Sequence, residues 1–144
     1  MIRPLESNDV EQVVAIWLES SLQAHYFIAD AYWQDQQAAM RDEYIPQSET
    51  LVLEENRVVL GFVSLVDEQI AALFVDVNAQ GKGYGKHLLQ EVQKHKKSLS
   101  LQVYKKNKKA IQFYQNQGFK KIEDQIDSAT GEEEYVMEWK SEQI

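Results

Sequence analysis

The spacing of hydrophobic and polar positions predicts two helices in the first third of the chain. Apolar residues recur at helical spacing and indicate an amphipathic helix with one buried face: Val10, Val13, Val14, Trp17 and Leu18. Asn8 and Glu11 resemble a capping box at its start. A second helical pattern covers residues 32–44, and we expect Pro46 to end it.

The rest of the chain reads as strands and helices joined by short turns. Residues 1–5 form a first short strand, and residues 50–54, 58–66 and 70–75 are extended runs whose short links imply an antiparallel meander. Gly61 indicates a bulge or bend in the second run. After these runs, the pattern predicts helices at residues 84–95 and 108–116. It predicts strands at residues 99–103, 119–124 and 135–139.

This order of elements predicts an α+β fold. We expect a central, mostly antiparallel sheet of about six or seven strands flanked by about four helices. No Ser/Gly/Pro-rich linker, low-complexity tract or repeat interrupts the chain, so residues 1–144 are expected to form a single domain. The architecture alone fixes no function.

Composition narrows the class of protein. The chain has no cysteine, which excludes disulfides, thiolate metal sites and a cysteine nucleophile. No apolar run reaches the roughly 20 residues of a membrane span, and no signal-peptide pattern begins the chain. We therefore expect a cytoplasmic protein, monomeric or homodimeric, that uses no metal and does not contact a membrane.

Charge is distributed unevenly along the chain. Residues 81–109 hold nine lysines and one acid, although the whole chain has a net charge of -8. Such a basic segment attracts a polyanion to one place while the acidic remainder repels it. General nucleic-acid binding usually needs a basic domain, so we expect no nucleic-acid partner.

Within the basic segment, a glycine-rich loop joins an apolar strand to a helix. Gly81, Gly83 and Gly85 follow the strand and lead directly into the helix. Glycines let a backbone come close to a ligand, and the free amides of a helix N-terminus favour phosphate or pyrophosphate. The spacing fits neither the mononucleotide P-loop nor the dinucleotide fingerprint.

Gln80-x-x-Gly83-x-Gly85 resembles the Gln/Arg-x-x-Gly-x-Gly/Ala motif of the GNAT superfamily of N-acetyltransferases. The resemblance implies acetyl-coenzyme A as the acyl donor, with its pyrophosphate on the loop amides and its pantetheine arm paired with the preceding strand. The residues implied in donor binding are Leu73, Phe74, Val75, Gln80, Gly81, Lys82, Gly83, Tyr84, Gly85, Lys86, Asn107, Lys109 and Tyr114.

A second motif carries the same resemblance. Residues 107–119 match the GNAT pattern Asn-x-x-Ala-x-x-Phe-Tyr-x-x-x-Gly-Phe at every fixed position. The residues alone predict that Ala110 and Phe113 form a buried helix face. They favour Tyr114 as a core aromatic residue whose hydroxyl contacts solvent. The family resemblance instead implies that Tyr114 is the catalytic acid that protonates the departing thiolate, and that Asn107 bonds the coenzyme or caps the helix.

The sequence defines the residues that would bind the acetyl acceptor less clearly than those that would bind the donor. His25, Tyr26, Phe27 and Trp33 lie where the family's first two helices form part of the acceptor site, and they could equally pack those helices together. For the general base, His25, Glu19, Glu43 and a chain of water molecules remain open. The chain is also similar to small bacterial GNAT proteins of the YiaC and YjaB kind, which implies protein lysine as one possible acceptor.

These patterns predict an enzyme that passes the acetyl group of acetyl-coenzyme A directly to a primary amine, on a small molecule or on a protein lysine or N-terminus. The alternative is a catalytically inactive coenzyme A-binding sensor of the same fold. The presence of Asn107 and Tyr114 favours the enzyme, whereas the lack of an obvious base favours the sensor.

Overall fold

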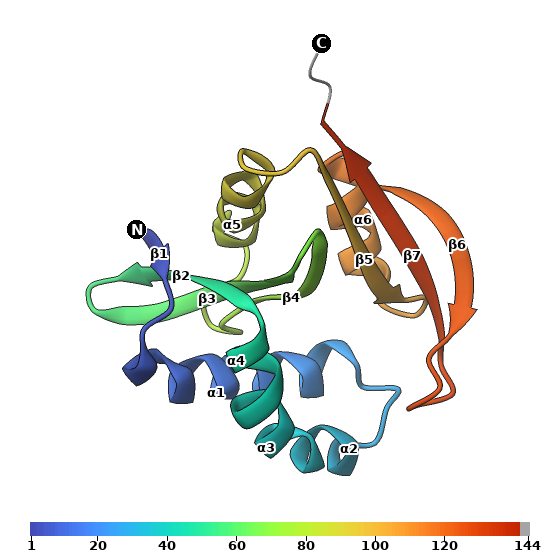
Figure 1. The fold of residues 1–144 in the computed structure, drawn as a ribbon. Coiled ribbons are helices and arrows are strands. Elements are labelled where there is room, and N and C mark those ends of the chain that lie inside the picture. Colours follow the sequence, from blue (N-terminus) through green and yellow to red (C-terminus); the bar gives the residue numbers. More distant parts are fainter. Residues whose placement is uncertain (142–144) are drawn as a thin grey trace.

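In the computed structural model, which describes residues 1–141, seven strands form one mixed sheet in the order β1-β2-β3-β4-β5-β7-β6 (Figure 1). Neighbouring strands are antiparallel except β4 and β5, which are parallel. This sheet confirms the predicted α+β fold. The strands are β1 (Ile2–Pro4), β2 (Glu49–Glu55), β3 (Val58–Val66), β4 (Gln69–Val75), β5 (Ser98–Tyr104), β6 (Lys120–Ile126) and β7 (Glu133–Lys140).

Helices cover both faces of the sheet (Figure 1). Helices α5 (Tyr84–Gln93) and α6 (Lys108–Asn116) lie on one face. The other face carries the N-terminal helices, which are η1 (Ser7–Asp9), α1 (Val10–Ala24), α2 (Asp30–Asp35), α3 (Gln37–Ala39), η2 (Met40–Tyr44) and α4 (Ile45–Gln47). The second predicted helix, residues 32–44, is helical, but a turn at Gln36 and the π-helical η2 divide it into short segments.

Two predicted boundaries in this N-terminal region are wrong. The capping box is formed by Glu6 and Asp9 instead of Asn8 and Glu11. Asp9 accepts a hydrogen bond from the Glu6 backbone N–H at 2.8 Å and pairs with Arg3 of β1 at 2.7 Å, so contact with the sheet selects the cap. Pro46 lies inside α4, which continues directly from η2 and ends one residue after the proline, at Gln47.

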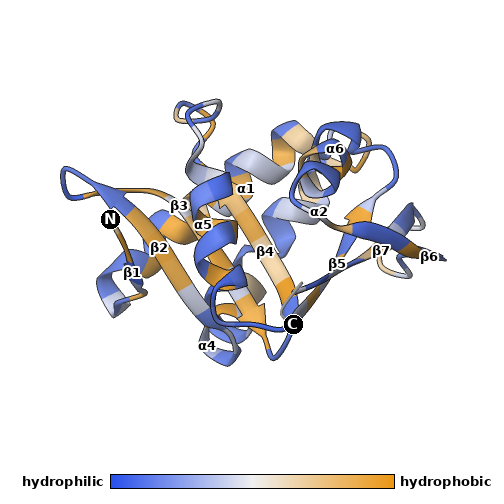
Figure 2. Cartoon of the chain, turned by 90° about the horizontal axis from the view of Figure 1, so that it is seen from above, coloured by the Kyte–Doolittle hydropathy of each residue, from blue (hydrophilic) through white to orange (hydrophobic). Residues whose placement is uncertain are grey.

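Side chains alternate between the two faces of the sheet along each strand, so the hydrophobic ones form a separate core on each face. In β2, Leu53 belongs to the core under α5 and α6, whereas Val52 belongs to the core under α1 and α2. Figure 2 shows the hydrophobic residues gathered along β2, β3 and β4, while β6 at the edge of the sheet is hydrophilic. The pairing of β2 with β3 shifts its register between Leu53 and Glu54, and Leu53 is the partner of Gly61. The irregularity predicted at Gly61 is therefore present.

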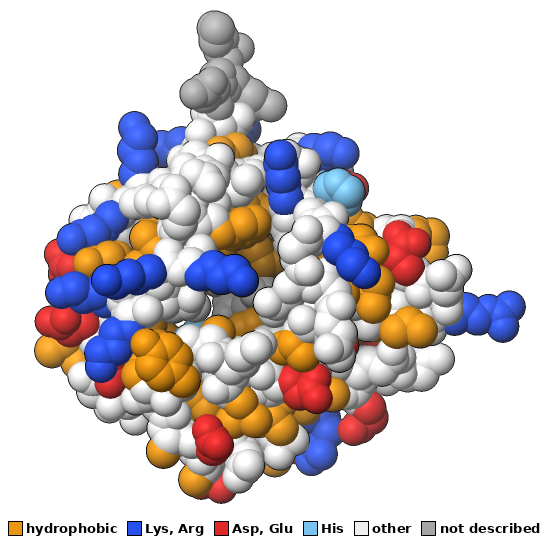
Figure 3. All heavy atoms as spheres, turned by 180° about the vertical axis from the view of Figure 1, so that it is seen from behind, with side chains coloured by type: hydrophobic (Ala, Val, Ile, Leu, Met, Phe, Trp, Pro, Cys, Tyr) orange, Lys and Arg blue, Asp and Glu red, His pale blue; other side chains and the backbone are white. Residues whose placement is uncertain are grey.

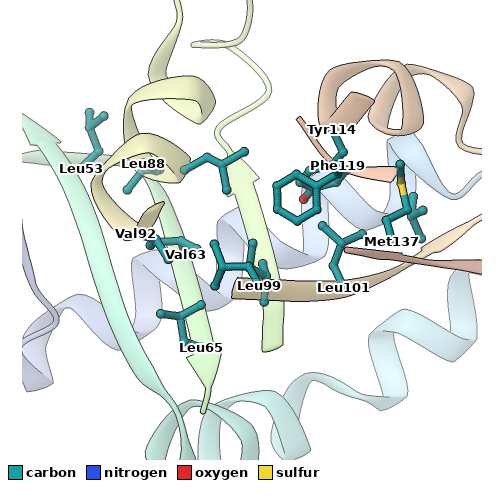
Figure 4. Close-up of a cluster of buried hydrophobic side chains, with 13 residues drawn as sticks. Leu53, Val63, Leu65, Leu88, Val92, Leu99, Leu101, Tyr114, Phe119 and Met137 are labelled. Carbon is teal, nitrogen blue, oxygen red and sulfur yellow. The ribbon is translucent and has the colours of Figure 1, made fainter. Parts of the chain in front are cut away.

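The core under α5 and α6 reaches the part of the molecule where the two motifs meet. Leu88, Leu99 and Met137 are fully buried there, and Tyr114 packs against Phe119 at 5.4 Å between ring centroids (Figure 4). Tyr114 is the buried residue of α6, whereas Ala110 and Phe113 are only partly buried. The core-aromatic interpretation of Tyr114 is thus correct for its ring.

The sheet opens between β4 and β5. These parallel strands pair only at Gln69 with Ser100 and at Ile70 with Leu101. Beyond Ile70, residues 71–75 of β4 continue with their β5-facing edge unpaired, because the two strands diverge. The divergence creates a cleft in the middle of the sheet.

Candidate active site

The cleft between β4 and β5 continues into a cavity of about 1230 Å³. This volume exceeds the roughly 300–1,000 Å³ of an ordinary small-molecule pocket. Four segments line it: the end of β4, the loop into α5 with the start of that helix, α6 with the residues beside its two ends, and the end of α1 with Tyr26 after it. The two sequence motifs, which are separated along the chain, therefore face one cavity.

The glycine loop has the backbone conformation that glycine allows. Gly81 and Gly83 have φ angles of 83° and 86°, in the left-handed region that other residues adopt at a cost. A Cβ placed on either glycine would have no atom within 4 Å, because both positions face open space. The loop thus presents bare backbone to the cavity.

The N-terminus of α5 adds free donors at the same place. The His87 N–H bonds the carbonyl of Gly83 at 3.0 Å, so the amides of Tyr84, Gly85 and Lys86 precede the first helical hydrogen bond. No side chain caps this end of α5. Three unpaired amides and the positive end of the helix dipole make a site for phosphate oxygens.

At the end of β4, the backbone groups of alternate residues face the cleft. The Asp76 N–H bonds Leu60 of β3 at 2.7 Å. Backbone groups alternate sides along a strand, so Phe74 also faces β3 while Leu73 and Val75 face the unpaired edge. The Val75 carbonyl already accepts hydrogen bonds from Ser20 Oγ at 3.2 Å, which anchors α1 to the strand, and from Gln80 Nε2 at 3.1 Å, which anchors the loop to it.

Lysines surround the opening of the cavity. Lys86, Lys106, Lys108 and Lys109 line it, and the lining contains no aspartate or glutamate. Lys106 is paired with Glu132 at 3.1 Å, but within residues 1–141 no carboxylate forms an ion pair with the other three. Figure 3 shows lysine side chains gathered around a hollow on this face. The opening therefore favours an anionic ligand.

Tyr114 of α6 lines the cavity. The residue is only 9% exposed, and burial raises the pKa of the phenol above its usual value. The hydroxyl forms no hydrogen bond with any residue that the structure describes, although Tyr114 lines the cavity. The group is therefore protonated at neutral pH and free to donate.

Asn107 joins the start of α6 to the end of α1. Its Oδ1 accepts the Ala110 N–H at 3.2 Å, which is the helix cap expected from the sequence. Its Nδ2 lies 3.4 Å from Nε2 of His25, the residue that follows α1. Burial lowers the pKa of His25 to about 4, so its imidazole is neutral at pH 7.

The structure brings together nearly all residues predicted to bind the donor. Every one of them lines the cavity except Lys82. On the acceptor side, Tyr26 lines the cavity and is 76% exposed, whereas His25, Phe27 and Trp33 do not line it. Those three form an aromatic cluster with Tyr104, in which the His25 ring lies 5.0–5.9 Å from the other rings.

None of the side chains considered as general base reaches the cavity. Glu19, Glu43 and His25 are all absent from its lining. The cavity-lining residues of the described chain include no histidine or carboxylate, so only the chain of water molecules remains of the original candidates.

The sequence analysis placed the first helix at the acceptor site but did not name the residues of α1 that line the cavity. Ser20, Gln23 and Ala24 line the cavity from one face of that helix. Their spacing of three and four residues could have revealed this face, since all three are small or polar and lie on one side of the helix. Gln117 after α6 was missed because no pattern in the sequence marks it.

Burial of His25 predicts a dependence of stability on pH. The pKa of His25 is about 4 in the fold, against an ordinary value of 6.5, so below pH 6.5 the unfolded chain binds a proton that the native state does not. We expect the free energy of unfolding to fall by about 3 kcal/mol from this residue between pH 6.5 and 4, and no further below pH 4.

Chemical denaturation across this pH range would measure the effect. His25→Gln should flatten the profile, whereas His95→Gln, at an exposed histidine, should retain it. Equal profiles for the wild type and His25→Gln would contradict a neutral, buried imidazole.

Two further observations describe the chain as a whole. Within the described part of the chain, no helix has both the length and the apolar character needed to cross a membrane. The same residues contain no group of three or more His, Asp or Glu side chains arranged to hold a metal ion.

The sheet topology, the glycine loop and the diverging strands define an acetyltransferase of the GNAT class. A family model described as the acetyltransferase (GNAT) domain matches residues 46–121, and the chain belongs to this family. It is an N-acetyltransferase, as the motifs predicted, and enzymes of this family use acetyl-coenzyme A.

Individual relatives place the chain more narrowly. It is 38% identical over 140 residues to the peptidyl-lysine N-acetyltransferase YiaC of Escherichia coli, covering 96% of each chain. It is 30% identical to the peptidyl-lysine N-acetyltransferase YjaB of Salmonella typhimurium, covering 83% of this chain and 82% of YjaB.

Solved structures agree with the fold. The solution structure of apo YjaB from Escherichia coli matches with a TM-score of 0.85 and 25% identity, over 96% of each chain. The PaiA N-acetyltransferase of Thermoplasma acidophilum, solved in complex with coenzyme A, matches with a TM-score of 0.82 at 21% identity over 98% of each chain. The predicted resemblance to the YiaC and YjaB group is confirmed.

Proposed function

We propose that this enzyme transfers the acetyl group of acetyl-coenzyme A to the ε-amine of a lysine in a protein. The observation that carries the proposal is the meeting of three features in one cavity: the free edge of β4, the uncapped N-terminus of α5 and the hydroxyl of Tyr114. Each feature fits a different part of one long thioester ligand.

The residues present fit such a donor. The amides of Tyr84, Gly85 and Lys86 would hold the pyrophosphate, with Lys108 and Lys109 supplying charge to further phosphates. The pantetheine arm would hydrogen-bond the backbone of Leu73 and Val75, in the manner of an added strand. Asn107 would donate to the coenzyme through the N–H of Nδ2 that His25 does not use.

The reaction is a direct transfer without a covalent enzyme intermediate. When bound, the donor supplies a thioester carbonyl that a neutral amine can attack, forming a C–N bond as the C–S bond breaks. The Leu73 N–H also faces the cleft, farther from the phosphate-binding loop than Val75, and would stabilise the negative charge that develops on the carbonyl oxygen. Phe74 is not suited to this role because its backbone faces β3.

Two protons must move during the reaction. The Tyr114 hydroxyl would donate its proton to the departing sulfur, which leaves as a thiol. The attacking amine would lose a proton to water, because no carboxylate or histidine lines the cavity. Holding both reactants in one cleft would supply much of the rate acceleration.

The acceptor assignment rests on the relatives and on the open side of the cavity. YiaC and YjaB are peptidyl-lysine N-acetyltransferases. In this chain the α1 side of the cavity ends at Gln23 and the 76% exposed Tyr26. An exposed aromatic ring at this end can pack against a cationic or aliphatic side chain, as an entering lysine requires.

Calorimetry followed by a transfer assay tests the proposal. We expect saturable binding of acetyl-coenzyme A, without comparable binding of NAD or ATP. A lysine-containing peptide incubated with the enzyme and donor should gain the mass of one acetyl group on the lysine, located by tandem mass spectrometry.

The outcomes separate the two halves of the proposal. Binding of the donor with transfer to small amines but never to peptides would refute the protein acceptor. Folded protein that fails to bind acetyl-coenzyme A would refute the whole assignment of the cavity.

A further inference from the structure

A buried histidine outside the cavity is connected to it by a single polar contact. His25 is 8% exposed, and its ring packs against Phe27, Trp33 and Tyr104. Its Nδ1 is buried without a hydrogen-bond partner among residues 1–141. A phenylalanine would fill such an aromatic cluster without leaving a polar atom unpaired, so packing does not explain the histidine.

The other ring nitrogen of His25 points to Asn107. Nε2 lies 3.4 Å from Asn107 Nδ2, and the two residues are 82 positions apart in the sequence. Because Asn107 Oδ1 already accepts the Ala110 N–H at 3.2 Å, the amide orientation is fixed and Nδ2 must be the atom that faces the histidine. The Nδ2 group is a donor, so His25 Nε2 must be the acceptor.

We propose that His25 is a positioning residue that holds the side-chain amide of Asn107 in place for the acyl donor. One N–H of Nδ2 bonds His25, which directs the second N–H toward the cavity that Asn107 lines. This inference rests on the proposed donor site and adds to it a residue that does not touch the ligand.

The surroundings of the histidine suit this role. The Asn107 N–H bonds the Tyr104 carbonyl at 2.9 Å, so the backbone of Asn107 is tied to the residue whose ring packs on His25. The His25 N–H bonds the Ser21 carbonyl at 2.9 Å, which fixes the histidine to the end of α1. These backbone bonds fix the residues on both sides of the 3.4 Å contact, which links the end of α1 to the N-terminus of α6.

Substitutions of His25 with matched shape and polarity test the inference. His25→Phe preserves an aromatic ring but removes the acceptor. His25→Gln retains an amide oxygen near the position of Nε2, whereas the shorter His25→Asn cannot reach Asn107. We expect His25→Phe and His25→Asn to weaken binding of acetyl-coenzyme A by about fivefold, the usual value of one hydrogen bond, and His25→Gln to restore most of it.

Stability must be measured beside affinity. His25→Phe should melt at the same temperature as the wild type or higher, because it removes the unpaired Nδ1. Loss of affinity together with unchanged or increased stability is the signature of a positioning residue. Loss of affinity that follows a fall in melting temperature in every variant would overturn the inference and show that His25 only supports packing.

A double-variant cycle tests whether His25 acts through Asn107. Asn107→Ser keeps an oxygen to cap α6 but removes Nδ2. His25→Phe should then have no further effect on donor affinity in the Asn107→Ser background, within about twofold. Additive losses would overturn the inference.

The experiment also separates this inference from the proposed function. If the wild type binds acetyl-coenzyme A and His25→Phe binds it equally well, the positioning role fails and the donor site stands. If the folded wild type does not bind, both fail.

Discussion

Tyr114→Phe should lower kcat by about a hundredfold or more, while acetyl-coenzyme A binds with nearly unchanged affinity. Phenylalanine preserves the ring that packs on Phe113 and Phe119 and removes only the hydroxyl. Without that hydroxyl, the sulfur must leave as an unprotonated thiolate. Steady-state kinetics with a lysine peptide, together with calorimetry of the donor, would separate the effect on turnover from the effect on binding.

Tyr135→Phe is the matched control for this substitution. Tyr135 lies on β7 outside the cavity lining, so the same loss of a hydroxyl should leave kcat unchanged. Normal turnover by Tyr114→Phe would show that another group, or water, protonates the sulfur.

Gly83→Asp should reduce binding of acetyl-coenzyme A below detection by calorimetry. The new carboxylate would stand at the uncapped N-terminus of α5, where the phosphate oxygens are expected, and would repel them. Aspartate tolerates the left-handed conformation of this position better than most residues, so charge rather than backbone strain should dominate the effect.

Two control variants distinguish charge from conformation. Gly83→Asn has almost the same shape and conformational tolerance but no charge, so it should retain clearly more donor affinity than Gly83→Asp. Gly131→Asp places the same residue at a left-handed glycine of the β6–β7 turn, outside the cavity, and should bind the donor normally. Equal losses in Gly83→Asp and Gly83→Asn would indicate that the loop conformation matters more than the charge.

The sequence predicted the elements best where local signals agree. The bounds of α6 and β3 match the predicted residues 108–116 and 58–66, because a cap or turn marks each end. The capping box before α1 was wrong because Arg3, on a different element, recruits Asp9 as the capping partner. Such a contact between segments has no signature in a local pattern.

The residues of the candidate site also divide into those that a local sequence signal marks and those that only tertiary packing brings to the cavity. The glycine loop and Asn107 are recognisable because backbone chemistry requires those residue types at those positions. Ser20 and Gln23 were not predicted, since they line the cavity only through the packing of α1 over the diverging strands. His25 was considered as an acceptor-site residue or base, and only its buried contact with Asn107 indicates a different role.

The diverging strands also determine how far an unpaired strand edge is exposed to other chains. Such an edge is a template for pairing with other chains, and proteins usually shield it. The open edge of β4 lies inside the sheet, between β3 and β5, with α1 on one face and α6 on the other. A single extended chain could enter this space and hydrogen-bond along β4, whereas the neighbouring strands and helices restrict the approach of another folded sheet. The fold therefore keeps an unpaired strand edge open to a narrow ligand while it shields that edge from other sheets.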